Sequence, residues 1–392
     1  MERGPLIYLD NGATSFPKPR TVYEATWDAM TRQGGNPGRG SHALSLAAAE
    51  LVYTCREQAA ELLGVAEPER IFFTLNTTHG LNTVLKGLLR EGDHVLISDL
   101  EHNAVYRPLY KLAEEGKITM DIFPSMVGDP RRNGTRICAG IARRLRPSTR
   151  MVVCTHASNI CSALMPIEQI GAFCHRHGLL FVVDAAQSAG HESISVDDMH
   201  IDAVCAPGHK GLYGPQGCGL VALGKGILPD SLLEGGNGVY SLEGRMPDFS
   251  PERFEAGTLP TPAIAGLSAG LRAVKSIGCE SIAAHERSLY RYAKEALSGL
   301  PEVQLYAPKE EGAILLFNLV GRRSDLVGAR LNERGICVRS GYHCSALGHR
   351  TLQTPPDGAV RVSFGIYNRF SEVDALYRAL EQIGRELPRE RN

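Results

Sequence analysis

Short apolar runs alternate with helical patterns through the first two thirds of the chain. The run "ERIFFTL" (69–75) precedes the amphipathic "NTTHGLNTVLKGLL", and "PIEQIGAFCHRHG" (166–178) separates two later runs. The other runs that we read as strands lie at 93–99, 151–158, 178–186, 202–208 and 219–223. Near-continuous apolar strands joined by helices indicate an α/β fold with a mainly parallel sheet that helices cover on both faces.

The pattern changes after "RFEAGTLPTPAIAG". One long helical segment is expected over about 262–299, followed by apolar runs at 313–320 and 359–364 and a last helix from Ser371. These features predict a smaller α/β domain at the C-terminus. We expect a large domain over 15–265 and a small domain formed by 1–14 and 266–392.

Size and composition exclude several classes of protein. A chain of 392 residues suits two domains, and a formal net charge of -1 favours neither nucleic acid nor an anionic membrane as a partner. No apolar run approaches the roughly 18 residues of a membrane span. The start, "MERGPLIYLDNGATS", does not read as a secretory signal, so we expect a cytoplasmic protein. The 10 cysteines show no CxxC spacing and no zinc-type cluster, so no metal is expected.

Polar side chains follow the ends of the predicted strands, where parallel α/β sheets bind their ligands. Taken singly, each could be a helix cap or a surface residue. Together they would converge at one edge of the sheet. The residues concerned are Thr77, Thr78, His102, Asn159, Asp184, Gln187, His209 and Lys210.

This set of groups suits pyridoxal 5′-phosphate. Thr77 and Thr78, at a helix start, could bind the phosphate, and Asp184 could hold the proton on the pyridine nitrogen. His102 could stack on the ring, and Lys210 could form a Schiff base with the aldehyde. The glycines on both sides of the lysine, in "GHKGLYG", would let the backbone approach the cofactor closely.

The sequence resembles the class V aminotransferase family, and within it the cysteine desulfurases and selenocysteine lyases. The resemblance covers nearly the whole chain, with motifs in the family's order and spacing. They are "NTTHGLN", "EHNA", "VVDAAQSAGH", "GHKGLYGPQGCG", "RFEAGT" and "RSGYHCSALGH". The resemblance implies fold-type I, the aspartate aminotransferase fold, and a homodimer.

The resemblance also implies roles for single residues. Cofactor binding would fall to the eight residues at the strand ends and to Thr258, which would reach the phosphate of the neighbouring subunit. The substrate would be bound by His42, Asn159, Arg339 and Arg361, with the last forking onto its carboxylate. One departure is Pro207, which stands where many group II desulfurases have a serine.

The activity implied is conversion of L-cysteine to L-alanine, with a persulfide formed on Cys344 and passed to a sulfur-acceptor protein. Catalysis would use Lys210, Cys344 and His102, with His343 as another proton carrier. Arg339, His343 and His349 could supply positive charge that lowers the pKa of the Cys344 thiol. Three alternatives remain: a selenocysteine lyase acting on L-selenocysteine, another class V aminotransferase or epimerase in which the cysteine is incidental, and a non-catalytic sulfur-transfer scaffold.

Overall fold

The computed structural model describes residues 6–38, 40–307, 309–310 and 312–389, and its larger sheet has seven strands in the order β2-β8-β7-β6-β5-β3-β4. Every strand is parallel to its neighbours except β8, which runs antiparallel to β2 and β7. The mainly parallel sheet is therefore confirmed. The bounds are β2 (Ile71–Thr74), β3 (His94–Ser98), β4 (Thr119–Phe123), β5 (Thr149–Thr155), β6 (Leu180–Asp184), β7 (Ala203–Pro207) and β8 (Gly219–Leu223).

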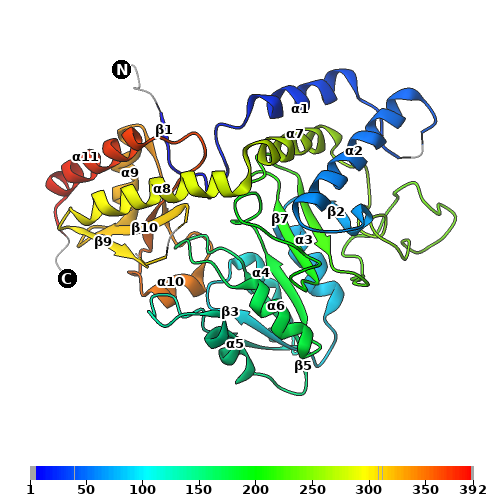
Figure 1. Cartoon of the computed structure of the whole chain (residues 1–392), viewed down its shortest axis with the longest axis horizontal. Coiled ribbons are helices and arrows are strands. Elements are labelled where there is room, and N and C mark those ends of the chain that lie inside the picture. Colours follow the sequence, from blue (N-terminus) through cyan, green and yellow to red (C-terminus); the bar gives the residue numbers. More distant parts are fainter. Residues whose placement is uncertain (1–5, 39, 308, 311, 390–392) are drawn as a thin grey trace.

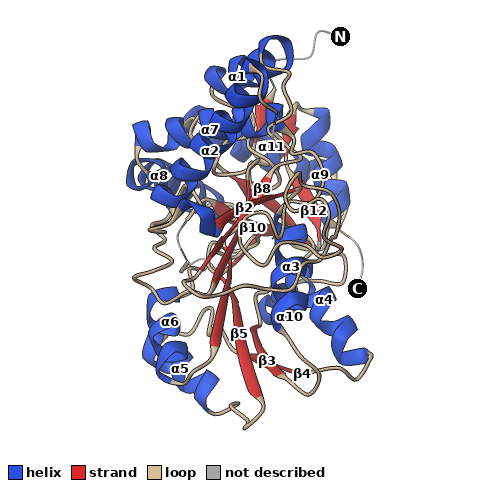
Figure 2. Cartoon of the chain, turned by 90° about the vertical axis from the view of Figure 1, so that its right-hand side faces the viewer, coloured by secondary structure: helices blue, strands red, loops and turns tan. Residues whose placement is uncertain are grey.

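Helices cover both faces of this sheet, as Figure 2 shows for α5 and α6 on one side and α3 and α4 on the other. Phe73 and Val152 belong to the core shared with α2, α5, α6 and α7, whereas Phe72 and Val153 belong to the core shared with α3 and α4. The two faces alternate along each strand, as the pleat requires. The bounds are α1 (Arg20–Arg32), α2 (Ala43–Leu62), a short 3-10 helix (Pro68–Arg70), α3 (Thr77–Leu88), α4 (Asn103–Glu114), α5 (Gly134–Ala142), α6 (Ile167–Arg176) and α7 (Thr261–Ile277).

A smaller antiparallel sheet in the order β12-β13-β10-β9 forms the C-terminal part, and β1 pairs with β11 beside it. The long helix α8 runs from the end of α7 along this sheet, with α9 and α11 close by (Figure 1). The strands are β1 (Ile7–Tyr8), β9 (Val303–Tyr306), β10 (Ile314–Leu319), β11 (Ile336–Cys337), β12 (Arg339–Gly341) and β13 (Ala359–Ser363). The helices are α8 (Cys279–Ser298), α9 (Ser324–Glu333), α10 (Ala346–Leu352) and α11 (Phe370–Glu386).

The single helical segment expected over 262–299 is wrong. Gly278 has a φ of 87°, which ends α7 and separates it from α8. Leu267 of α7 packs in the core of the large sheet, and Leu289 of α8 packs in the core of the small one. The boundary at residue 265 stays a prediction, and residues 1–5 and 390–392 of the predicted small domain lie outside the described residues.

No helix in the described part of the chain combines the length and the apolar character that crossing a membrane requires.

Candidate active site

A cavity of about 520 Å³ lies at the carboxyl ends of the large-sheet strands. Eight of the residues selected from the sequence line it, so segments far apart in the chain do converge. They are Thr77, Thr78, His102, Asn159, Asp184, Gln187, His209 and Lys210. Pro207 also lines the cavity and brings no side-chain hydrogen-bonding group.

One corner of the cavity is suited to an anion. Asn76 caps α3 by accepting a hydrogen bond from the His79 backbone N–H (2.9 Å), which places Thr77 at the first helical position. The Thr77 hydroxyl and His209 Nδ1 are buried and have no hydrogen-bond partner among the described residues. Buried polar groups are rarely left unpaired, and a helix N-terminus favours negative charge. This corner fits the phosphate of pyridoxal 5′-phosphate.

Asp184 and Lys210 face the same cavity. Asp184 ends β6, and its Oδ1 accepts a hydrogen bond from the Ala186 backbone N–H (2.9 Å). Burial raises the pKa of the Asp184 carboxyl, so its anionic form is costly unless a cation such as a protonated ring nitrogen lies beside it. Burial, followed by repulsion from Arg361, lowers the pKa of Lys210 to about 8. The neutral amine is the form that attacks an aldehyde, so it is accessible near neutral pH.

The packing of the protein itself requires the glycines around Lys210. A Cβ on Gly208 would lie 2.6 Å from the Cys218 carbonyl oxygen, and a Cβ on Gly211 would lie 2.4 Å from the Ala189 carbonyl oxygen. Both contacts are closer than real Cβ atoms tolerate, and both are with the protein's own backbone. The glycines therefore allow neighbouring segments to pack against the lysine turn. That they also let the backbone approach a cofactor stays a prediction.

His102 caps α4 with its side chain. Its Nδ1 accepts a hydrogen bond from the Ala104 backbone N–H (3.0 Å), so the ring proton lies on Nε2. Burial and the positive charge of Lys210 lower the pKa of His102 to about 4, which keeps the imidazole neutral. The cap fixes a flat, neutral ring in the wall of the cavity. Stacking on a cofactor ring stays a prediction.

Glu101, directly before His102, makes the free energy of unfolding depend on pH. Its Oε1 accepts hydrogen bonds from the Thr155 backbone N–H (2.7 Å) and the Ser98 hydroxyl, and its Oε2 has no partner among the described residues. Burial raises the pKa of Glu101 from 4.5 to about 8. The folded protein therefore keeps this carboxyl protonated at neutral pH, whereas the unfolded chain releases the proton.

Glu101→Gln is expected to flatten the pH dependence of stability. A raised folded pKa contributes stability below the unfolded pKa, and that contribution is lost as the pH rises toward about 8. Wild type should lose about 1.4 kcal/mol per pH unit relative to the variant, a few kcal/mol in all, because Gln reproduces the protonated carboxyl. Denaturant unfolding of both proteins between about pH 5 and pH 9 measures the difference. Parallel stability curves would contradict the assignment.

Arg361, on β13, is only 2% exposed, and two of its three guanidinium nitrogens have partners. Its Nη2 lies 2.7 Å from Asp10 Oδ1, and its Nη1 donates to the Asn159 carbonyl oxygen at 3.0 Å. Its Nε is buried and has no partner among the described residues, and Arg361 is not among the residues that line the Lys210 cavity. Asp10 was not predicted as a site residue, although an acidic residue directly after the apolar "IYL" of "IYLDNG" was a signal.

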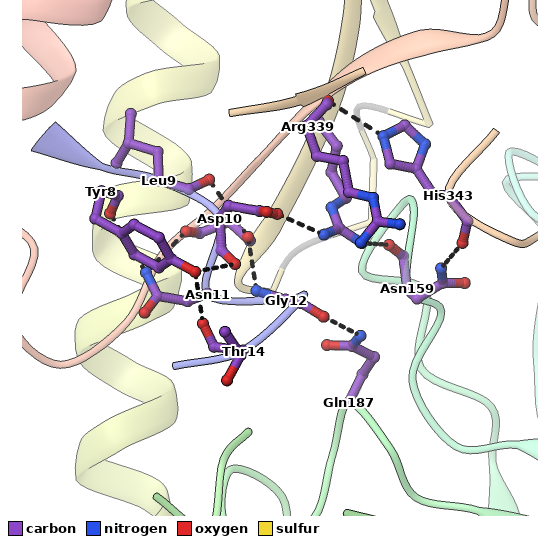
Figure 3. A network of polar contacts seen from close by, with 12 residues as sticks. Tyr8, Leu9, Asp10, Asn11, Gly12, Thr14, Asn159, Gln187, Arg339 and His343 are labelled. Atoms are coloured by element: carbon purple, nitrogen blue, oxygen red, sulfur yellow. Dashed lines mark hydrogen bonds and ion pairs between the residues drawn. The ribbon is translucent and has the colours of Figure 1, made fainter. Parts of the chain in front are cut away.

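The N-terminal segment crosses the site beside Lys210. Gly12 accepts a hydrogen bond from Gln187 Nε2 through its carbonyl oxygen (2.8 Å), as Figure 3 shows, and its N–H donates to the Ser363 hydroxyl at 2.8 Å. Ser15 donates its hydroxyl to the Lys210 carbonyl oxygen at 3.0 Å. The segment thereby connects the lysine turn to β13 and holds Gln187 by its amide nitrogen, which leaves the side-chain oxygen available to a ligand.

Cys344 lies on a turn between β12 and α10 and is the one exposed residue among the ten cysteines, all of which are free. The Asn103 backbone N–H donates to the Cys344 carbonyl oxygen (2.8 Å), and Asn159 Nδ2 donates to the His343 carbonyl oxygen (2.8 Å). The turn is thus tied to a residue that lines the cavity and to the residue after His102.

The predicted positive charge on His343 and His349 is wrong. Burial lowers the pKa of His343 to about 3 and that of His349 to about 4, so both rings are neutral. His343 Nε2 lies 3.2 Å from the Arg339 carbonyl oxygen and its Nδ1 lies 3.2 Å from His349 Nε2, so both ring nitrogens already have partners within the protein. Of the three groups proposed to supply charge, only Arg339 keeps it.

His42 and Thr258 lie apart from the Lys210 cavity. They line a second, larger hollow of about 1850 Å³, next to Arg56 and Glu255. His42 caps α2, with its Nδ1 3.3 Å from the Ser45 backbone nitrogen. Within one chain these two residues therefore do not join the other site residues.

Comparisons with known proteins agree with this arrangement. The family model described as "Aminotransferase class-V" matches residues 7–376. Proteins named cysteine desulfurase from Salmonella agona and Salmonella typhimurium are each 33% identical to this chain over 393 aligned positions, which cover 98% of the chain and 94% of each relative.

Solved structures agree as well. The apo cysteine desulfurase of Thermococcus onnurineus NA1 has a TM-score of 0.87 and 31% identity, covering 97% of this chain and 95% of that one. The Escherichia coli cysteine desulfurase CsdA, crystallised as an S-sulfonic acid, has a TM-score of 0.86 and 27% identity, covering 98% and 96%. The predicted fold-type I architecture is confirmed. Because one family model spans nearly the whole chain and the Salmonella relatives exceed 30% identity over almost all of it, the chain belongs to the class-V aminotransferase family.

Proposed function

We propose that this protein is a pyridoxal 5′-phosphate-dependent cysteine desulfurase that converts L-cysteine to L-alanine and receives the sulfur on Cys344. The observation that carries the proposal is a single cavity lined by both Lys210 and Asp184, with the turn of an exposed thiol tied to its wall. Relatives named cysteine desulfurase align over almost the full chain and support the same assignment.

The cofactor would be held by groups that lack partners in the described part of the chain. The Thr77 hydroxyl, His209 Nδ1 and the start of α3 would bind its phosphate, with Thr78 at the same helix start. Asp184 would hold the ring nitrogen, and Lys210 would bind the aldehyde carbon. When bound there, pyridoxal phosphate supplies an electron sink for the bonds at the substrate Cα.

The substrate carboxylate would bind to Arg361 through the buried Nε–H that has no partner among the described residues. Arg339 would add a second positive charge on the side of the Cys344 turn, because its backbone oxygen contacts the ring of His343 (Figure 3). A carboxylate bound in this way would direct the substrate side chain away from β13. The amino acid would then be held between the two arginines and Lys210.

The chain's own groups then move protons and sulfur. The Lys210 amine takes the proton from the substrate Cα, and its pKa of about 8 suits that exchange near neutral pH. The Cys344 thiolate attacks the substrate sulfur, so that an S–S bond forms as the substrate C–S bond breaks. The electron pair of the broken bond stays on the carbon, which takes up a proton and leaves as alanine. Sulfur is oxidised and carbon is reduced, so no external oxidant is needed.

We place His42 and Thr258 at the site of a second copy of the chain, which would make the enzyme a homodimer. Both residues line a hollow separate from the Lys210 cavity of their own chain. Nearby helices expose large apolar side chains, with Trp27 66% and Met30 64% exposed on α1. Exposed apolar patches of this kind mark interaction surfaces. A solution mass equal to one chain would contradict this assignment.

The proposed location is the cytoplasm, where a protein acceptor would take the sulfur from the exposed Cys344. All ten cysteines are free in the structure, as a reducing compartment requires.

The proposal is tested by adding L-cysteine to the loaded enzyme and measuring alanine and the mass of the Cys344 peptide. We expect alanine together with an adduct of about 32 Da, one sulfur atom, on that peptide. L-Selenocysteine is supplied in a parallel reaction. Turnover of selenocysteine alone would assign the protein as a selenocysteine lyase, and alanine without an adduct on Cys344 would exclude the persulfide route.

A further inference from the structure

Two neutral imidazoles lie directly behind the cysteine turn. His343 Nε2 lies 3.2 Å from the Arg339 carbonyl oxygen, and His343 Nδ1 lies 3.2 Å from His349 Nε2. His349 Nδ1 lies 2.8 Å from the Thr354 hydroxyl. The planes of the two rings are nearly parallel, at an interplanar angle of 11°. A continuous chain of contacts therefore runs from β12 to the residues that follow α10.

The Arg339 carbonyl oxygen and the neutral state of both rings together fix the direction of every hydrogen bond. A carbonyl oxygen only accepts, so His343 Nε2 carries the ring proton and His343 Nδ1 is an acceptor. His349 Nε2 must then donate, which leaves His349 Nδ1 to accept from the Thr354 hydroxyl. Burial keeps the pKa of both rings far below neutral, and the nearby charges of Arg361 and Arg339 act on His343 in the same direction. Each ring therefore carries a single proton, and the hydrogen bonds cannot run in the opposite direction.

The turn needs such support because its backbone is strained. His343 and Cys344 have φ values of 50° and 56°, so two consecutive residues with side chains occupy the left-handed region. Residues with side chains are unfavourable in this region and persist only where surrounding contacts hold them. The hydrogen bonds from Asn159 and Asn103 hold the two carbonyl groups of this turn. The contacts among the two imidazoles hold the buried side chain of His343.

We propose that His349 and Thr354 are positioning residues for sulfur transfer, because they orient His343 and thereby hold Cys344 in place for attack on the substrate. The inference rests on the proposed desulfurase function. His349 lies on α10, where its backbone N–H donates to the Ser345 carbonyl oxygen at 3.0 Å. The contact from His349 to the turn therefore starts from a helix, α10.

The test compares His349→Ala with His349→Gln, whose Nε2 can still donate to His343, and with Thr354→Val, which removes only the terminal hydroxyl. The matched control is His94→Ala. His94 is also a buried imidazole whose Nδ1 lies 2.8 Å from a threonine hydroxyl, that of Thr149, but it lies at the opposite end of β3 from the site.

In the loaded enzyme, His349→Ala is expected to slow persulfide formation on Cys344 at least about tenfold. The cysteine concentration that half-saturates the change in cofactor absorbance should stay within about twofold of wild type, because His349 is not among the residues proposed to bind the substrate. His349→Gln should recover most of the rate. Thr354→Val should lose about two- to fivefold, and His94→Ala should keep the wild-type rate.

Hydrogen exchange provides a readout that does not depend on activity. Amides of the segment 342–354 should lose protection in His349→Ala and keep it in His349→Gln. Equal rates in His349→Ala and wild type would overturn the inference, and so would a His349→Gln variant as slow as His349→Ala. If wild type forms no persulfide, the proposed function fails, and the exchange measurement still decides whether the imidazole chain orders the turn.

Discussion

Lys210→Ala is expected to remove the visible absorbance of the lysine-bound cofactor and to lower cysteine turnover by at least about 10⁴-fold. The amine is the one group in the cavity that can both bind the cofactor aldehyde and take the substrate Cα proton, so one substitution removes two functions. Reconstitution with pyridoxal phosphate, followed by absorbance spectra and alanine assays, measures both effects.

We do not expect loss of folding to explain such a result. Burial lowers the pKa of Lys210, which means that the folded protein disfavours its charged form, so removal of the amine is expected to cost the cofactor-free fold little. Lys86→Ala is the control, because Lys86 is an exposed lysine on α3. The assignment fails if Lys210→Ala retains both the absorbance and the turnover of wild type.

The sequence was sufficient for six of the seven strands of the large sheet and for most of the cavity. Strands such as β5 and β6 are buried on both faces, so each appears as a nearly unbroken apolar run whose last polar residue marks the binding edge. Asp184 and Lys210 were found for that reason. Their joint presence in one cavity follows from the topological rule for parallel sheets and needs no knowledge of side-chain packing.

The remaining features depend on long-range contacts that no local pattern contains. β4 lies at the sheet edge and is partly exposed, so "TMDIF" lacks the apolar run that marks the other strands. Asp10 acquires its role only when β13 brings Arg361 to it. His343 and His349 look like sources of charge in the sequence, and burial makes them neutral. Proximity in sequence to Cys344 therefore predicted the correct neighbours and the wrong protonation state.

Cys344→Ala is expected to lower alanine formation from L-cysteine by at least about 10³-fold while the cysteine-induced change in cofactor absorbance remains. In the proposed site, the substrate binds to Arg361 and Lys210, which lie outside the Cys344 turn, whereas breaking its C–S bond needs a thiolate to accept the sulfur. Stopped-flow absorbance and single-turnover alanine assays separate the two steps. The exposed side chain contributes little to packing, so the variant should fold normally.

Cys138→Ala is the matched control, because Cys138 is a partly exposed cysteine on α5 and none of the residues that line the Lys210 cavity is a cysteine. It should keep the wild-type rate and the adduct on Cys344. The outcome of Cys344→Ala also decides between the two reaction classes that this family architecture can support. An aminotransferase or epimerase works only on bonds at the substrate Cα, which Lys210 reaches, and would not need the thiol. Undiminished alanine formation in Cys344→Ala would therefore place all of the chemistry at Lys210 and would contradict sulfur transfer through the turn.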